Sequence, residues 1–426
     1  MTTNQSKTIA EKLDKEDPLY HFRKRFYIDS ESTIYLDGNS LGRLPLKTKA
    51  LISDVVENQW GRELIESWNR HWYQKAIQLG DKIAPIIGAT TGEVIVTDST
   101  SLNLYKLAHA ALKYQKGKTT IVSDVLNFPT DLYILQGLIR EFGAKYTLEL
   151  AGSNDNISIE TDEIKSKITE NTALVVLSLV AFKSAFMYQL DEITEHAHKM
   201  GALVLLDLSH AAGAVEIKLN QNNVDLAVGC TYKYLNGGPG SPAFLFVRHD
   251  LQEKLHSPIQ GWFGDAQPFE FDLNYRPAPG IRKFLTGTPP VLNLMAIEPG
   301  LDIINEAGIK NIHKKSIQLS DFFLSLVESQ LSQLGFELGS PTNPGKRGSH
   351  IALKHPEAYR ICQALIQPKS SSIKVIPDFR EPDNIRFGFT PLYTTFTEVW
   401  QTVQRMQEIV ENSEFEEYSA KRSDVT

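Results

Sequence analysis

The sequence predicts an α/β protein with a large, doubly wound, mainly parallel sheet and a smaller α+β domain after it. Short apolar strands at 94–97, 119–123, 145–150 and 173–177 alternate with helical stretches, the pattern of strands joined by covering helices. The run 202–206 contains no polar residue, which indicates a strand buried on both faces, as in parallel sheets. Ligands of such sheets bind beyond the carboxyl ends of the strands, so we expect the functional residues there.

We divide the chain into an N-terminal arm at 1–50 that contributes to the small domain, a large domain at 51–286, and connecting helices with the small C-terminal domain at 287–426. Within this last part the sequence predicts a long amphipathic helix near 308–334, a turn-rich break at 341–348, strands at 350–353 and 384–389, helices at 356–366 and 395–411, a loop at 367–374, and a disordered, charged tail after Ser413.

Composition excludes several classes of function. The 426 residues are 42% hydrophobic and carry a net charge of −7, so the chain lacks the basic surface typical of nucleic-acid binding. No apolar run approaches the ~20 residues of a membrane-spanning helix, and residues 1–15 lack the apolar centre of a signal peptide, so we expect a cytoplasmic protein. The two cysteines, Cys230 and Cys362, form no CxxC pair, and we predict neither disulfides nor a metal site.

Lys233 is the residue at which we expect the chemistry. It lies between Tyr232 and Tyr234, just after the apolar stretch 224–229, and burial beside aromatic rings would favour the neutral amine that forms Schiff bases. Asp207 closes the preceding strand. An amine and a carboxylate in one crevice are what pyridoxal 5′-phosphate (PLP) requires, because the amine binds its aldehyde and the carboxylate keeps its ring nitrogen protonated. The alternatives are a solvated lysine beside a turn and an aspartate that caps a helix or forms a structural ion pair.

A phosphate cradle is predicted where the strand 94–97 leads into a helix. Ser99, Thr100 and Ser101 place three hydroxyls at the helix start, where free amides and the helix dipole favour an anion, although capping alone would explain one of them. Phe128 and Asp131 follow the next strand. The phenylalanine could stack on a planar cofactor, and its alternative role is core packing.

Motifs along nearly the whole chain resemble those of the kynureninase family, PLP enzymes of fold type I in class V of the aspartate aminotransferase superfamily. The matching stretches are Tyr35-Leu36-Asp37-Gly38-Asn39-Ser40-Leu41-Gly42, Asp98-Ser99-Thr100-Ser101, Phe128-Pro129-Thr130-Asp131, Asp207-Leu208-Ser209-His210-Ala211, Tyr232-Lys233-Tyr234-Leu235-Asn236, Gly261-Trp262-Phe263-Gly264, Gly287-Thr288-Pro289-Pro290 and Arg386-Phe387-Gly388-Phe389-Thr390-Pro391-Leu392-Tyr393. The order of these motifs is specific to the family. The resemblance implies a large seven-stranded sheet domain.

The resemblance also implies a role for each matching residue. Lys233 would bind PLP as a Schiff base and Asp207 would pair with its ring nitrogen. The other cofactor contacts implied are Thr100, Ser101, Phe128, Asp131, Ser178, His210 and Tyr232, with Trp262 and Thr288 lent by the neighbouring subunit of a homodimer with shared active sites. The substrate contacts implied are Arg386, which would bind the α-carboxylate, Trp68 and Trp72, which would shape the aniline-ring pocket, and Asn39 and Ser40 of the N-terminal signature.

The reaction implied is hydrolytic cleavage of the Cβ–Cγ bond of L-kynurenine, which gives anthranilate and L-alanine in tryptophan catabolism. Tyr232 would donate or relay a proton, or serve as a phosphate ligand only. The chain departs from the family at Leu179 and Ala185, where relatives often carry histidine and glycine, so local contacts there are open. Thr288, where enzymes that prefer 3-hydroxykynurenine tend to have asparagine, favours plain kynurenine.

Two other functions remain open from the sequence. One is a different PLP reaction, such as transamination or cysteine desulfuration, although Cys230 lies too close to Lys233 to act as a mobile catalytic cysteine. The other is a binding protein that keeps the fold without catalysis, against which the presence of Lys233, Asp207 and Arg386 argues.

Overall fold

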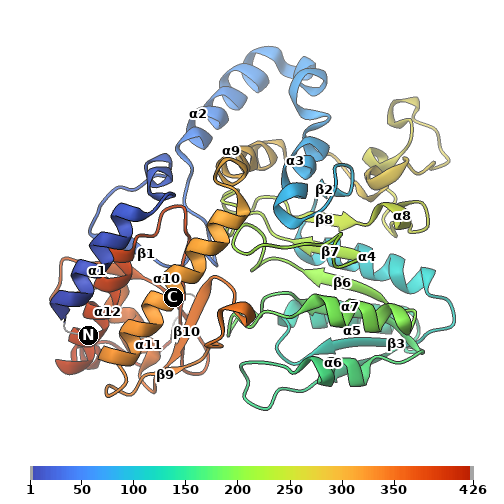
Figure 1. Cartoon of the computed structure of the whole chain (residues 1–426). Coiled ribbons are helices and arrows are strands. Elements are labelled where there is room, and N and C mark those ends of the chain that lie inside the picture. The colour runs from blue at the N-terminus through green and yellow to red at the C-terminus, as the bar shows by residue number, and fades with distance from the viewer. Residues whose placement is uncertain (1–2, 423–426) are drawn as a thin grey trace.

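The computed structural model describes residues 3–422 and contains one large sheet and a smaller domain beside it (Figure 1). The large sheet has seven strands in the order β2-β8-β7-β6-β5-β3-β4. Their bounds are β2 Val94–Val96, β3 Thr120–Asp124, β4 Thr147–Ala151, β5 Thr172–Ser178, β6 Leu203–Asp207, β7 Leu226–Gly229 and β8 Phe244–Val247. Only β8 runs antiparallel to its neighbours β2 and β7, so the predicted, mainly parallel sheet is confirmed.

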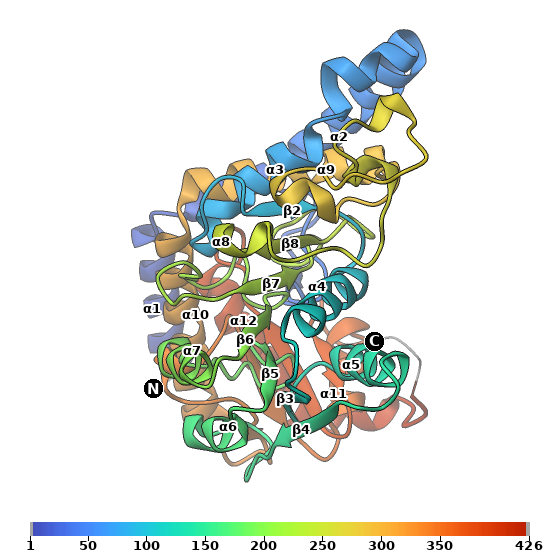
Figure 2. The ribbon, with the colours of Figure 1, turned by 90° about the vertical axis from the view of Figure 1, so that its right-hand side faces the viewer.

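Helices cover both faces of this sheet, as the continuous apolar strands require. Every residue of β5, β6 and β7 is buried, because helices α4 and α5 lie on one face and α6 and α7 on the other (Figure 2). The helices of this part of the chain are α2 Leu46–Asp54, α3 Lys75–Ile83, α4 Thr100–Tyr114, α5 Pro129–Glu141, α6 Thr161–Lys167, α7 Leu190–Lys199 and α8 His249–Gln252.

The small domain is built on a four-stranded antiparallel sheet with the order β12-β13-β10-β9. These strands are β9 Glu337–Leu338, β10 His350–Lys354, β12 Asp378–Arg380 and β13 Asn384–Gly388, and the helices of this half are α9 Val291–Ala307, α10 Ile309–Gln330, α11 Ala358–Ile366 and α12 Phe396–Glu411. Apolar side chains of α10, α11, α12 and the sheet form a second core that is separate from the core of the large domain.

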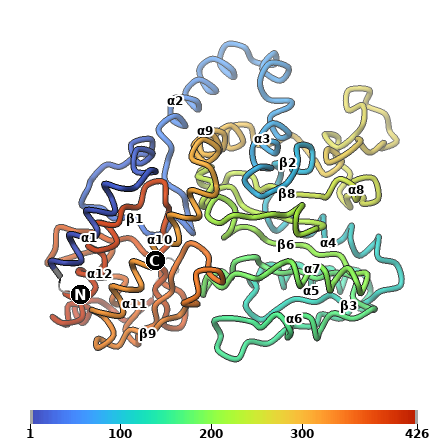
Figure 3. The backbone as a smooth tube through the Cα atoms, viewed as in Figure 1, coloured from blue at the N-terminus to red at the C-terminus, as the bar shows by residue number. Residues whose placement is uncertain are grey.

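The beginning of the chain packs into this second core. Helix α1 (Thr3–Glu16) contacts α12, so the first and last α-helices of the described residues lie side by side (Figure 3). Strand β1 (Thr33–Tyr35) pairs in parallel with β11 (Lys374–Ile376), and Ile34 and Leu36 are fully buried there. The chain then crosses to the large domain through α2.

The prediction of a disordered tail after Ser413 is wrong for the residues that follow directly. Glu414–Glu417 forms a short helix, and the carboxylate of Glu414 is buried against Arg405 at 2.5 Å while it also accepts a hydrogen bond from Ser370. A charged composition therefore did not prevent folding, because a buried arginine compensates the charge. Residues 423–426 of the predicted tail lie outside the described residues.

Two segments project from the same end of the molecule, away from both sheets (Figures 1 and 2). One is the continuation of α2 through residues 55–72, which includes the π-helical stretches Val55–Glu63 and Trp68–Trp72. The other is the loop that contains the short helices Trp262–Gly264 and Pro268–Glu270. Within residues 3–422, none of the helices combines the length and apolar character needed to cross a membrane.

Candidate active site

The site lies where the carboxyl ends of β5, β6 and β7 meet, the edge at which open α/β sheets bind ligands. Ser178 ends β5, Asp207 ends β6, and Lys233 lies in the loop that follows β7. These residues line a cavity of about 100 Å³ together with Thr100, Ser101, Phe128, Thr130, Asp131, Val180, Ser209, His210 and Tyr232. Residues that are more than a hundred positions apart in the sequence thus converge on one lysine.

Lys233 is paired with a histidine rather than with a carboxylate. Its Nζ lies 3.0 Å from Nε2 of His210. Burial, together with the positive charge of Lys233, lowers the pKa of His210 well below its usual range, so the imidazole is neutral and can accept a hydrogen bond from the amine.

Two carboxylates face this amine from the surrounding elements. Burial raises the pKa of Asp207, although a hydrogen bond from the Ser209 amide at 2.8 Å and the charge of Lys233 both act to lower it. Burial and the nearby charge of Asp207 raise the pKa of Asp131 well above its usual range. Two buried acids beside a single amine form a site that is short of positive charge, which a cationic ligand group would supply.

The residues present fit PLP. In the described part of the chain, Oδ2 of Asp131 and Nδ1 of His210 are buried without a hydrogen-bond partner. Each atom can therefore form a hydrogen bond with a polar group at the edge of a ligand. Asp207 provides the carboxylate that a pyridine nitrogen needs, and Lys233 provides the amine for an aldehyde. The same four side chains would hold the polar edges of one planar ring.

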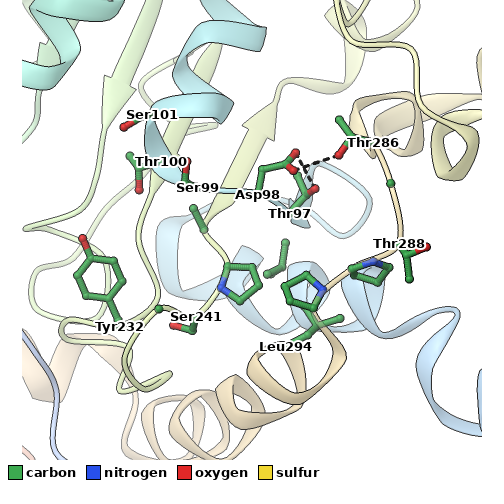
Figure 4. Close-up of a pocket in the computed structure, with 17 residues that line it drawn as sticks. Thr97, Asp98, Ser99, Thr100, Ser101, Tyr232, Ser241, Thr286, Thr288 and Leu294 are labelled. Atoms are coloured by element: carbon green, nitrogen blue, oxygen red, sulfur yellow. Dashed lines mark hydrogen bonds between the residues drawn. The ribbon is translucent and has the colours of Figure 1, made fainter.

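A second cavity of about 480 Å³ adjoins the first through their shared residues Thr100, Ser101 and Tyr232. Figure 4 shows these three on one side of it and Thr288 on the other. The hydroxyl of Ser99 caps α4 by accepting from the Leu102 amide at 3.3 Å. Capping therefore uses Ser99 alone and leaves the Thr100 and Ser101 hydroxyls for an anion at the helix start.

Asn127, to which the sequence assigned no role, holds two residues that line the cavity of Lys233. Its Oδ1 accepts from the Ser178 hydroxyl at 2.7 Å and from the Phe128 amide at 2.8 Å. Its Nδ2 donates to the Ser123 hydroxyl at 3.0 Å. The amide thereby ties the loop before α5 to the end of β5, and the ring of Phe128 stays partly exposed over the cavity.

The N-terminal signature lies directly on the lysine loop. The Gly42 amide donates to the Tyr232 carbonyl at 2.8 Å, and a Cβ at Gly42 would come within 2.3 Å of the Lys233 carbonyl. Only glycine permits this approach. Asn39 is fully buried against Gly388 of β13, with both amide atoms unpartnered among residues 3–422.

Arg386 is 1% exposed and already has several acceptors within the chain. Its Nε donates to Asp378 at 2.7 Å, its Nη2 donates to Asp378 and to Ser40, and its Nη1 donates to the Phe182 carbonyl. A substrate carboxylate would therefore approach the edge of the guanidinium that faces Ser40 and Phe182, because Asp378 occupies the other edge. The role of Arg386 in substrate binding stays a prediction.

The three predicted tryptophans do not line the cavity of Lys233 within one chain. Trp68 and Trp72 pack against each other at 5.4 Å between ring centroids, and Trp72 donates to the Gln59 side chain at 2.8 Å. Phe263 contacts Trp68 and also Trp262, whose own ring is 42% exposed. These residues form a cluster in the projecting segments and line neither cavity, so their predicted roles would require a second subunit.

Comparison with known proteins decides the family. Kynureninase from Pseudomonas fluorescens is 43% identical over 404 residues, which cover 94% of this chain and 94% of the relative. Kynureninase from Burkholderia pseudomallei (strain K96243) is 41% identical over the same shares. The chain belongs to the kynureninase family. The family model for the kynureninase C-terminal domain matches residues 312–406, the part that contains Arg386.

Solved structures that are similar to this kynureninase-family chain show its fold. A cysteine desulfurase from Thermococcus onnurineus NA1 has a TM-score of 0.75 at 19% identity, over 94% of this chain and 98% of that one. The cysteine desulfurase CsdA from Escherichia coli has a TM-score of 0.75 at 17% identity, over 92% and 98%. C-DES, solved with glycine covalently linked to its PLP cofactor, has a TM-score of 0.75 at 16% identity, over 88% and 96%. The predicted PLP fold type I architecture is confirmed.

Replacing Asn127 by alanine should lower PLP affinity about 10- to 100-fold, because Ser178 and Phe128 lose the buried amide that orients them. Titration of the apoprotein with PLP, followed by absorbance, measures the change. Asn154→Ala, at an exposed asparagine, is the matched control. Equal affinity in both variants would contradict the positioning role of Asn127.

Proposed function

We propose that this protein is a PLP-dependent hydrolase that cleaves the Cβ–Cγ bond of L-kynurenine and releases anthranilate and L-alanine. The observation that carries the proposal is the convergence of Lys233, Asp207 and Asp131 at one sheet edge in a chain that is 43% identical to a kynureninase over 94% of its length. When bound, PLP supplies a protonated ring that withdraws electrons from a carbon next to the substrate nitrogen.

Each residue of the chain then has a task that its surroundings support. Asp207, buried at the end of β6, would hold the proton on the ring nitrogen. Lys233 would bind the cofactor and, once displaced by the substrate amine, take the proton from Cα. Its partner His210 is neutral and would accept a hydrogen bond from the amine between these steps.

Tyr232 is suited to donating a proton. The neighbouring Cys230 and burial raise the pKa of this phenol above its usual range, so it stays protonated at neutral pH. It lines both cavities and therefore faces the region between the lysine and the phosphate cradle. A protonated phenol could return a proton to the alanine carbon after cleavage or hydrogen-bond the phosphate.

The desulfurase alternative is disfavoured by the surroundings of Cys230. This residue follows β7 directly and is 2% exposed, and its Sγ lies 3.8 Å from the Ser209 carbonyl. Burial raises the pKa of its thiol, whereas a sulfur-accepting cysteine needs an accessible thiolate. The likeness to desulfurase structures is one of fold alone.

The purified protein should be yellow from PLP and should release fluorescent anthranilate from L-kynurenine, faster than it releases 3-hydroxyanthranilate from 3-hydroxykynurenine. Lys233→Ala should abolish both reactions, and Lys254→Ala, at an exposed lysine, should change neither rate. Release of alanine and persulfide from cysteine, with no anthranilate from kynurenine, would contradict the proposal and show that the protein is a cysteine desulfurase. A protein that never shows the ~420 nm band of bound PLP would indicate a binding protein without catalysis.

We also propose that two copies form a homodimer with shared active sites. The projecting segments expose large apolar side chains, with Leu273 99%, Ile65 77% and Phe271 75% exposed. Apolar groups of this size on adjoining projections are typical of interfaces. A second copy is the occupant we infer, because Trp262 and Thr288 are exposed beside these projections and the resemblance assigns both to a neighbouring site.

Shared sites can be tested with two inactive variants. Lys233→Ala and Trp262→Ala should each have low activity alone, and hybrid dimers should recover it, because one site combines an intact lysine from one subunit with an intact tryptophan from the other. Leu273→Glu should shift the solution mass toward the monomer, while Tyr133→Glu, at an exposed residue outside the projecting segments, should not. A mixture no more active than the sum of its parts would contradict shared sites.

A further inference from the structure

His350, to which neither the motifs nor the family resemblance gave a role, lies on the same face of the small sheet as Arg386. In the antiparallel pairing of β10 with β13, His350 is opposite Gly388 and Ala352 is opposite Arg386. Residues opposite each other point to the same face, and so do residues two apart on one strand. His350 and Arg386 are therefore diagonal neighbours, and Gly388, which has no side chain of its own, lets the Asn39 side chain pack at this face.

The imidazole of His350 also faces the cofactor side of the site. Its ring centroid lies 5.5 Å from that of His210, and Nε2 of His210 lies 3.0 Å from Nζ of Lys233. His350 thus lies close to His210, the partner of the amine that receives an amino acid, and on the same sheet face as the guanidinium predicted to bind its carboxylate.

This imidazole is fully buried, yet neither of its ring nitrogens has a hydrogen-bond partner among residues 3–422. The Phe182 carbonyl, which accepts from Arg386, lies near the ring without completing a hydrogen bond to it. A buried polar group without a partner destabilises the fold, so a ligand partner is the expected reason for keeping a histidine here. Both side-chain amide atoms of Asn39, which packs against the same Gly388, also lack a hydrogen-bond partner among residues 3–422.

We propose that His350 is a substrate-contacting residue whose ring N–H donates a hydrogen bond to the α-carboxylate of the bound amino acid, beside Arg386. This inference rests on the proposed function in that it takes an amino acid as the ligand of Lys233. Burial and the positive charge of Arg386 lower the pKa of His350 to about 3, so the ring is neutral and has one N–H to donate.

The test compares two ligands that differ in the carboxylate. The PLP absorbance of the holoenzyme is titrated with L-alanine and, separately, with the amine obtained by removing the carboxyl group of kynurenine. His350→Phe keeps a planar ring without nitrogen atoms. It should raise the Kd of L-alanine about 10- to 100-fold and leave the Kd of the amine within about twofold, because only the first ligand has the acceptor. Arg386→Ala should show the same selectivity.

Two further variants keep the test decisive. His313→Phe, at a histidine of α10 outside the site, should change neither Kd. His350→Gln retains an amide donor and should recover part of the L-alanine affinity, and it replaces the phenylalanine variant if that protein does not load PLP.

Equal weakening of both ligands in His350→Phe would overturn the inference and leave His350 as a support for Phe182. No weakening of either ligand would also overturn it, and a water molecule would then satisfy the ring. These outcomes are distinct from failure of the proposed function, since a protein that binds L-alanine without releasing anthranilate from kynurenine still reports on His350.

Discussion

The contact between Lys233 and His210 is the interaction on which the site depends. A lysine amine at this sheet edge faces the buried acids Asp207 and Asp131, and an ion pair with either would engage the amine and that acid with each other. The amine instead lies 3.0 Å from a histidine whose pKa is lowered by burial. The acids are thus left for a cationic ring, and the lysine is left for an aldehyde. Pairing of Lys233 with His210 rather than with a carboxylate distinguishes this site from a structural salt bridge.

Contacts between the two domains complete this arrangement. The approach of Gly42 to the Lys233 loop brings the N-terminal arm onto the large domain, while β1 of the same arm pairs with β11 of the small domain. Arg386 reaches from the small sheet to the Phe182 carbonyl of the large domain. The domains therefore meet at the lysine through backbone and charged contacts, and Phe26 of the arm and Tyr393 of the small domain also pack into the apolar core of the large domain. Residues of the large domain around Lys233 and Arg386 of the small domain are therefore close enough to contribute to one site.

Much of this architecture could be predicted because it is local. An apolar strand that ends in a polar residue placed Asp207 at the sheet edge, and the hydroxyls at the start of α4 suggested a phosphate cradle. The family resemblance added Ser178 at the end of β5. Residues whose role comes from register or long-range pairing could not be found this way. His350 begins a strand whose sequence looks like ordinary core. Asn127 holds side chains from other segments of the chain. Asp378 lies opposite Arg386 on the neighbouring strand and binds one edge of its guanidinium. Glu414 looked like part of a solvated tail because nothing near it in sequence reveals its pairing with Arg405.

Covalent attachment of PLP to Lys233 and to no other lysine can be measured directly. Borohydride reduction of the PLP-loaded protein fixes the Schiff base, and mass spectrometry of its peptides locates the modified residue. We expect a phosphopyridoxyl group on Lys233 in stoichiometric amount, with none on the buried Lys106, which pairs with Asp98 of the second cavity. A label on any other lysine, or a protein that takes up no label, would contradict this expectation.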